Sequence, residues 1–231
     1  MRVAIHQPQY LPWLGYFEKV DQADVFVLLD TVQFKKHEWQ NRNRIKTPQG
    51  PQWLTVPVYD RFPERIDGVE IDNTHDWRRK HRQALAIHYG RSAAFPEFRG
   101  VVEAFLDRPW TRLADLNIAL VEALVGALGI TTKTVRASAL EASDDPTGRL
   151  VDLCRACGAS VYLAGAGGAG YMDLDRFRRA GIAVWSQAYA HPEYPQRYGP
   201  FCSHLSVVDL LFNQGAASLT ILRGGSRWVR P

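Results

Sequence analysis

Residues 3–30 read VAIHQPQYLPWLGYFEKVDQADVFVLLD, and they place a strand, a helix and a second strand in close succession. Val3–Ile5 and Asp24–Asp30 are continuous apolar runs, which is typical of strands buried on both faces of a parallel sheet. Leu14–Gln22, between them, has apolar residues at helical spacing. This order predicts a βαβ unit with a right-handed crossover.

Polar side chains follow both predicted strands. His6 and Asp30 are expected at the carboxyl ends of neighbouring parallel strands, where ligands bind in open α/β sheets. An imidazole titrates near neutral pH, so His6 is a candidate general base or oxyanion donor, and Asp30 is a candidate to orient His6 or bind a substrate amine. Gln7 and Tyr10, in the same loop, are candidates to hydrogen-bond a polar substrate. The alternatives are that His6 shapes the turn and that Asp30 caps the following loop.

The remaining chain continues the α/β pattern. Residues 43–47 and 52–56 predict a hairpin around a Pro-Gln-Gly turn. Further predicted strands are 132–135, 161–163 and 182–185, and further predicted helices are 147–157, 173–179, 206–212 and 216–222. The terminal GGSRWVRP is expected to be loose.

Helical spacing over residues 76–90, 98–107 and 111–128 predicts a helical insertion or subdomain at about 76–128. We therefore expect one domain over residues 1–231. Its fold class is α/β, a Rossmann-like three-layer structure with a parallel or mixed sheet and this insertion.

Length and composition narrow the protein class. The chain has 231 residues, 46% hydrophobic and 23% charged, which excludes a disordered tail protein. Three cysteines do not make a disulfide framework. No apolar run of about 18 residues is present, so no membrane span is expected, and the first residues lack the apolar stretch of a signal peptide. These features predict a cytoplasmic protein.

The net charge of +4 is concentrated in two clusters. Trp77–Arg82 has four positive charges, but successive helix positions point in different directions, which favours a solvated helix face. Residues 35–46 have five positive charges against one glutamate. The rest of the chain is net negative, which argues against nucleic acid as a partner.

The segment FKKHEWQNRNR, residues 34–44, is the first candidate binding site. Lys35, Arg42 and Arg44 are expected to hold phosphate or carboxylate groups of a small-molecule substrate, because guanidinium groups bind such oxygens bidentately. Trp39 and Asn41 would line the pocket. The alternative is a solvated edge strand whose charges oppose aggregation.

The glycine run GAGGAG, residues 165–170, matches G-x-G-x-x-G after a strand. No acidic residue follows at the next strand end, and the motif is late in the chain, so NAD is not expected. Gly165 and Gly167 are instead candidates for a loop that contacts substrate, with a structural turn as the alternative. The Cys154-x-x-Cys157 pair is interpreted as buried packing, so no metal site is predicted.

Four segments together resemble the WbqC-like protein family. The first is HQPQYLPWLGYFEKVDQADVFVLLDTVQFKKHEWQNRNRIKTPQGPQWLTVPV, residues 6–58. The others are residues 150–173, 181–196 and 201–215, which read LVDLCRACGASVYLAGAGGAGYMD, GIAVWSQAYAHPEYPQ and FCSHLSVVDLLFNQG. The resemblance implies a role in surface-polysaccharide or natural-product biosynthesis, without supplying a catalytic residue set.

The resemblance favours a small-molecule transferase that moves an acyl or aminoacyl group from an activated donor to an amino sugar or another amine. Its candidate donors are coenzyme A and phosphopantetheine-linked thioesters, with an acyl carrier protein as a candidate partner. In this hypothesis His6 deprotonates the acceptor amine. The alternative is a non-catalytic binding module for a phosphorylated intermediate or nucleotide. Trp39 and Trp53 beside two arginines suggest a third reading, single-stranded nucleic-acid binding, which the local character of the charge disfavours.

Overall fold

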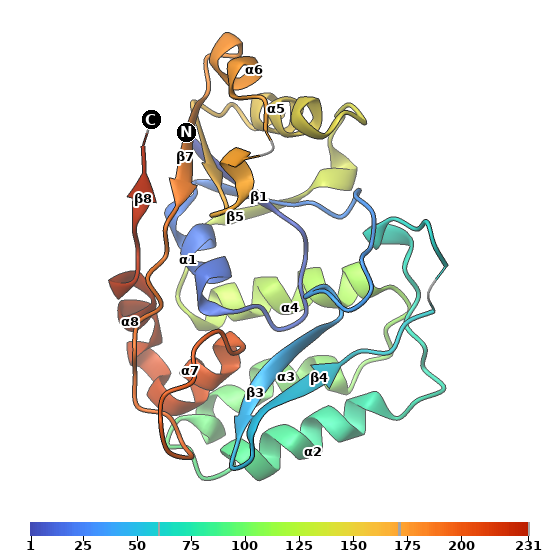
Figure 1. The fold of residues 1–231 in the computed structure, drawn as a ribbon. Coiled ribbons are helices and arrows are strands. Elements are labelled where there is room, and N and C mark those ends of the chain that lie inside the picture. The colour runs from blue at the N-terminus through green and yellow to red at the C-terminus, as the bar shows by residue number, and fades with distance from the viewer. Residues whose placement is uncertain (60, 171, 231) are drawn as a thin grey trace.

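The computed structural model describes residues 1–59, 61–170 and 172–230, and its centre is a six-stranded sheet (Figure 1). The strands lie in the order β5-β2-β1-β6-β7-β8. All neighbours pair in parallel except β7 and β8, so the sheet is mixed. The strand bounds are β1 Arg2–His6, β2 Val25–Leu28, β5 Lys133–Arg136, β6 Val161–Ala164, β7 Ala183–Gln187 and β8 Trp228–Val229.

The predicted βαβ unit is confirmed. β1 leads through α1 (Leu14–Gln22) into β2, and the two strands pair in parallel from Val3 opposite Val25 to His6 opposite Leu28. The chain then continues outward to β5 and returns on the other side of β1 to form β6. The strand order therefore reverses between β1 and β6, and such a switch point opens a crevice at the carboxyl ends of the strands.

Helices cover both faces of the sheet, because successive strand residues point to opposite sides. Ala4 packs in the core shared with α1 and α4 (Leu113–Ala127). Val3 and Ile5 pack in a second core with α5 (Pro146–Ala156) and α6 (Leu174–Arg179). The three-layer α/β prediction is confirmed.

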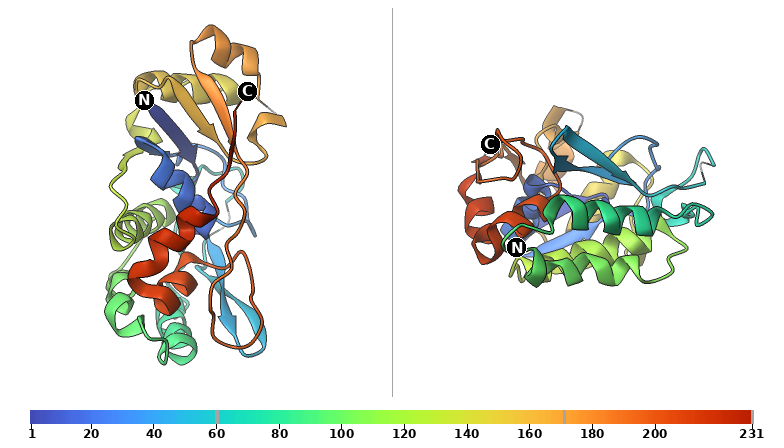
Figure 2. Two further views of the ribbon diagram at one scale, coloured as in Figure 1. Left: turned by 90° about the vertical axis from the view of Figure 1, so that its left-hand side faces the viewer. Right: turned by 90° about the horizontal axis from the view of Figure 1, so that it is seen from below.

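The predicted hairpin is also confirmed, as β3 (Arg42–Thr47) paired antiparallel with β4 (Gly50–Thr55). It is followed by α2 (Trp77–Tyr89), α3 (Phe95–Leu106) and α4. The hairpin, α2 and α3 lie below the sheet in Figure 1, and the side view in Figure 2 shows the same elongated arrangement. The core on the α1 face continues without a break into this region.

The end of the chain differs from the prediction of a loose tail. After α7 (Val207–Gln214) and α8 (Ser218–Gly224), β8 pairs antiparallel with β7. The reason is a buried carboxylate on α1: Glu18 accepts hydrogen bonds from the Ser226 hydroxyl at 2.5 Å and the Trp228 indole at 2.9 Å. These bonds hold the last described residues against the sheet.

The described residues contain neither a membrane-spanning helix nor a cluster of metal ligands. None of their helices has the length and apolar character needed to cross a lipid bilayer. No three of their His, Cys, Asp and Glu side chains are grouped as ligands of a metal ion.

Candidate functional site

His6 is the last residue of β1 and forms part of the wall of two cavities. The smaller cavity, of about 150 Å³, lies on the α1 side and reaches the first residues after β6. The larger, of about 400 Å³, lies on the α5 side. One imidazole at the switch point of the sheet therefore separates two spaces that can each hold a molecule or a group.

The protonation of His6 follows from its contacts. Its Nδ1 lies 3.1 Å from the Gln7 carbonyl oxygen, which can only accept a hydrogen bond. We therefore assign the proton of the neutral ring to Nδ1, which leaves a lone pair on Nε2. Burial, with a smaller effect from the charge of Lys19, lowers the pKa of His6 to about 3. The ring is therefore neutral at physiological pH.

Lys19 lines the smaller cavity from α1, and only 2% of the residue is exposed. Burial lowers its pKa from 10.5 to about 7, because an ammonium ion loses hydration in the interior, and the charge of Glu18 opposes this shift. Glu18 accepts a third hydrogen bond, from the Gln187 side-chain amide at the end of β7. With a pKa of about 7, about half of the Lys19 amine is neutral at pH 7 and is able to accept a proton.

Two further residues shape the smaller cavity. Tyr16, one turn before Lys19, is buried, and its hydroxyl has no hydrogen-bond partner among the described residues. Gly165 lies opposite, where an added Cβ would be 3.6 Å from Lys19 Nζ. The cavity thus presents an amine and an imidazole to its contents, while the Tyr16 hydroxyl is buried in its wall.

Aromatic rings border the smaller cavity at Trp13 and Tyr189. Trp13 stacks on His204 with ring centroids 5.1 Å apart and meets Tyr189 edge-on at 5.7 Å. A Cβ on Gly15 would lie 2.3 Å from the Trp13 ring, so this close approach requires glycine. Trp13 is therefore fixed between α1 and the segment that follows β7.

The similarity of this chain to known proteins extends over nearly its whole length. The model of the WbqC-like protein family matches residues 7–221. The chain belongs to the WbqC-like protein family. It is also similar to "Uncharacterized protein Rv1507c" of Mycobacterium tuberculosis, with 38% identity over 226 residues that cover 96% of this chain and 97% of that protein. No solved structure matches the chain.

In this WbqC-like protein Asp30 is buried, and its carboxylate is bound by a loop after β5. Its two oxygens accept hydrogen bonds from the Ser138 backbone amide at 2.9 Å and the Ser138 hydroxyl at 2.7 Å. Asp30 thus fastens the end of β2 to the short helix η2 (Ala137–Ala139). These carboxylate contacts go neither to His6 nor to the loop that begins at Thr31, which was the predicted alternative, but to a residue 108 positions along the chain.

The two other candidates from the first loop lie in different surroundings. Gln7 lines the larger cavity, and its side-chain oxygen accepts a hydrogen bond from the Gln40 amide at 2.7 Å. Tyr10 is fully buried, with its hydroxyl 2.8 Å from His81 Nδ1, and borders neither cavity that His6 lines. The structure therefore brings Gln7, but not Tyr10, to the site.

The predicted phosphate-binding arginines of the hairpin pack on tryptophan rings. The Arg42 guanidinium lies 4.3 Å from the centre of the Trp53 ring, and Arg44 lies 5.5 Å from Trp53 and 5.8 Å from Trp39. Neither cavity at His6 includes these side chains. They form a separate surface on the hairpin, held by cation–π contacts.

Of the other predicted binding residues, only one borders a cavity at His6. Lys35 is exposed, and its backbone amide donates to the Gln40 side chain at 2.8 Å. Asn41 is buried and donates to the Val56 carbonyl at 3.0 Å, which links the two ends of the hairpin. It borders neither cavity at His6. Gly165 borders the smaller cavity, whereas Gly167 is exposed.

Lys19, Tyr16 and Arg149 border the two cavities but were not among the sequence candidates. A lysine in an amphipathic helix is ordinarily interpreted as solvent-exposed. The available signal was spacing: Lys19 is three residues after Tyr16 and four after Gly15, so all three share one helix face directly after the His6 loop.

Proposed function

We propose that this WbqC-like protein is a small-molecule transferase that moves an acyl or aminoacyl group from an activated donor to an amine. The observation that carries the proposal is the position of His6 between two cavities of unequal size, with the buried amine of Lys19 in the smaller one. A transfer reaction needs two reactants on either side of one proton-handling group, and this arrangement meets that need.

The cavity sizes suit the two reactants. A water molecule in the liquid occupies about 30 Å³, so a space of about 150 Å³ holds a group of only a few heavy atoms. This matches an acyl or aminoacyl group and is too small for a nucleotide. The larger space, about 400 Å³, is within the range of ordinary small-molecule sites.

In the proposed reaction the acceptor nitrogen attacks the carbonyl carbon of a thioester or acyl phosphate. A C–N bond forms, the C–S or C–O bond breaks, and the leaving group departs with the electron pair. The neutral amine of Lys19 takes the proton released by the attacking nitrogen and returns it to the leaving group. His6 Nε2 accepts a hydrogen bond from the same nitrogen and orients its lone pair.

Lys19 is the better proton acceptor of the two residues. A general base is most effective when its pKa lies near the working pH, and the pKa of Lys19 is about 7 whereas that of His6 is about 3. The sequence-based assignment of His6 as the base therefore becomes a positioning role in the proposal.

The test is a transfer assay read by mass spectrometry. Purified protein is incubated with acyl-coenzyme A and aminoacyl-thioester donors against amino sugars and other primary amines. The expected product is an amide with the mass of donor acyl group plus acceptor. Lys19→Met should reduce its formation at least 100-fold and His6→Ala at least tenfold, whereas His75→Ala, at an exposed histidine, should have no effect. No amide formation by the natural protein would refute the proposal, and equal product formation by Lys19→Met would refute the role of Lys19 as the proton acceptor.

A second candidate, a binding module for a phosphorylated intermediate or nucleotide, is favoured by the hairpin surface of Arg42, Arg44, Trp39 and Trp53. It would bind a nucleotide or coenzyme A without turnover. Binding would then be lost in Arg42→Ala and retained in Lys19→Met, the reverse of the pattern expected for the transferase.

A further inference from the structure

The larger cavity at His6 is lined by apolar side chains, by polar groups and by a single cationic side chain. Ile5, Leu29, Val32 and Leu150 supply the apolar surface, and Arg149, on the first turns of α5, supplies the charge. We infer that this cleft binds a small molecule with an apolar body and one carboxylate, with the carboxylate on Arg149 and the other end at His6.

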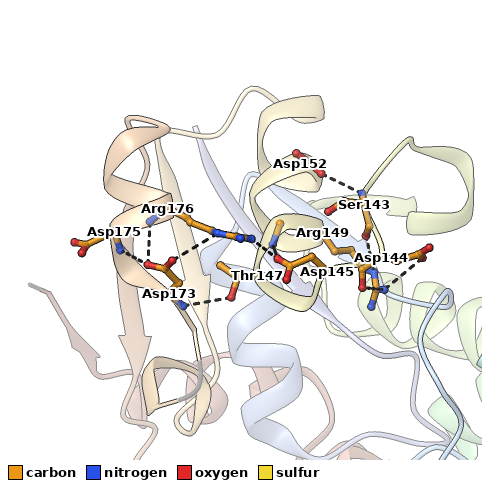
Figure 3. A network of polar contacts seen from close by, with 10 residues as sticks. Ser143, Asp144, Asp145, Thr147, Arg149, Asp152, Asp173, Asp175 and Arg176 are labelled. Atoms are coloured by element: carbon orange, nitrogen blue, oxygen red, sulfur yellow. Dashed lines mark hydrogen bonds and ion pairs between the residues drawn. The ribbon is translucent and has the colours of Figure 1, made fainter.

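Arg149 is held in place by neutral acceptors. Its Nε donates to the Ser143 carbonyl at 3.2 Å, and its Nη2 donates to the Asp144 carbonyl at 2.8 Å (Figure 3). Among the residues the structure describes, Nη1 has no acceptor. The guanidinium group is therefore oriented by the backbone while its charge is left for another partner.

The acidic residues around Arg149 do not neutralise it closely. Asp144 approaches only to 3.8 Å, and its side chain is fully exposed to solvent. Asp145 accepts hydrogen bonds from the Gly148 amide and Arg176, and Asp152 accepts one from the Ser143 amide, as Figure 3 shows. The Arg149 side chain is only 17% exposed, so water solvates its charge poorly. A bound anion would therefore stabilise it.

The number of charges limits the ligand class. The other residues with polar side chains that line the cleft are His6, which is neutral because burial lowers its pKa, the uncharged Gln7, and Tyr162. One guanidinium pairs with one carboxylate through two parallel hydrogen bonds, whereas a di- or triphosphate needs several cations. The apolar side chains among the lining residues provide contacts for an alkyl or aryl body.

This inference rests on the proposed function in one respect, that the ligand in the cleft is one of the two reactants. Its test measures binding and not turnover, so the two can fail separately. The probe is 3-phenylpropanoate, and its neutral counterpart is 3-phenylpropanamide, both titrated into the full chain by isothermal calorimetry or ligand-observed NMR.

The natural protein should bind the carboxylate saturably and at least tenfold more tightly than the amide. Arg149→Gln should weaken carboxylate binding at least tenfold, because a charge-assisted bidentate pair is lost. Arg155→Gln removes an equal charge from an exposed position of the same helix and should leave the dissociation constant unchanged. Thermal unfolding of each variant checks that it is folded.

A second variant keeps the test decisive if Arg149→Gln is unstable. Val32→Phe narrows the cleft while Arg149 is retained, and it should abolish binding of the same probe. Equal affinity for carboxylate and amide, no binding of either, or unchanged binding in folded Arg149→Gln or Val32→Phe would overturn the inference. Carboxylate binding that depends on Arg149, together with no amide formation by the natural protein, would support the inference and refute only the transferase.

Discussion

Lys19→Met should change how the stability of the protein depends on pH. Between pH 7 and pH 10.5 the unfolded chain keeps a proton on Lys19 that the folded protein has released, because burial lowers the folded pKa to about 7. Stability therefore rises with pH wherever the unfolded state binds more protons. Methionine has a similar length and no titratable group, so its variant lacks this contribution.

The magnitude follows from the two pKa values. With 10.5 unfolded and about 7 folded, burial of the lysine costs about 4 kcal/mol at pH 7 and about 1 kcal/mol at pH 9.5. Between pH 7 and pH 9.5 the free energy of unfolding of the natural protein should therefore increase by about 3 kcal/mol relative to that of Lys19→Met. Below pH 7 the difference between the two proteins should be nearly constant.

The assay is urea unfolding of both proteins from pH 6 to pH 9.5, followed by tryptophan fluorescence. Lys80→Met, at an exposed position of α2, is the matched control, and its difference from the natural protein should not change with pH. If Lys19→Met and the natural protein showed parallel pH dependences, Lys19 would have an ordinary pKa and could not serve as a proton acceptor near pH 7.

Three further results are expected. Gly15→Ala should displace the Trp13 ring, since the new Cβ would lie 2.3 Å from it, and should change tryptophan fluorescence and reduce amide formation. Glu18→Gln should lower the free energy of unfolding by about 3 kcal/mol, because three donors lose a charged acceptor, as measured by urea unfolding. The transfer rate should rise with pH through about 7 and then level off as Lys19 loses its proton, as followed in buffers from pH 5.5 to pH 9.

Each result has a matched control or a contrary outcome. Gly126→Ala, where an added Cβ meets nothing within 4 Å, should leave fluorescence unchanged. Glu97→Gln, at an exposed position of α3, should leave the free energy of unfolding unchanged. If Glu18→Gln changed it no more than Glu97→Gln does, the three hydrogen bonds to Glu18 would not contribute to stability. A rate independent of pH between 5.5 and 9 would exclude Lys19 as the proton acceptor.

The fold could be predicted from local sequence because its elements have unambiguous patterns. Val3–Ile5 and Asp24–Asp30 are apolar without interruption, and the hairpin around residues 48–50 has a turn signal at its centre. The position of His6 at the carboxyl edge of the sheet followed from the same reasoning and agrees with the structure. These inferences needed only contacts between neighbouring elements.

The rest of the site depends on contacts between distant residues. The partner of Asp30 is Ser138, 108 residues away, and no local pattern indicates it. Lys19 is buried because Glu18, its neighbour, is tied to Gln187, 169 residues along the chain. The hairpin cluster was interpreted from its charge, but the aromatic rings that hold Arg42 and Arg44 became evident only from the pairing of β3 with β4.

The hydrogen bonds of Glu18 also determine when α1 can pack fully against the sheet during synthesis of the chain. Glu18 is made 208 residues before Ser226 and 210 residues before Trp228, so α1 leaves the ribosome long before two of its three donors exist. Until then the carboxylate next to Lys19 must remain hydrated, and α1 cannot settle fully against the sheet. The βαβ unit can form early, but the cavity that holds Lys19 is completed only when Gln187 and Tyr189 are in place, and the last donors to Glu18 follow later still.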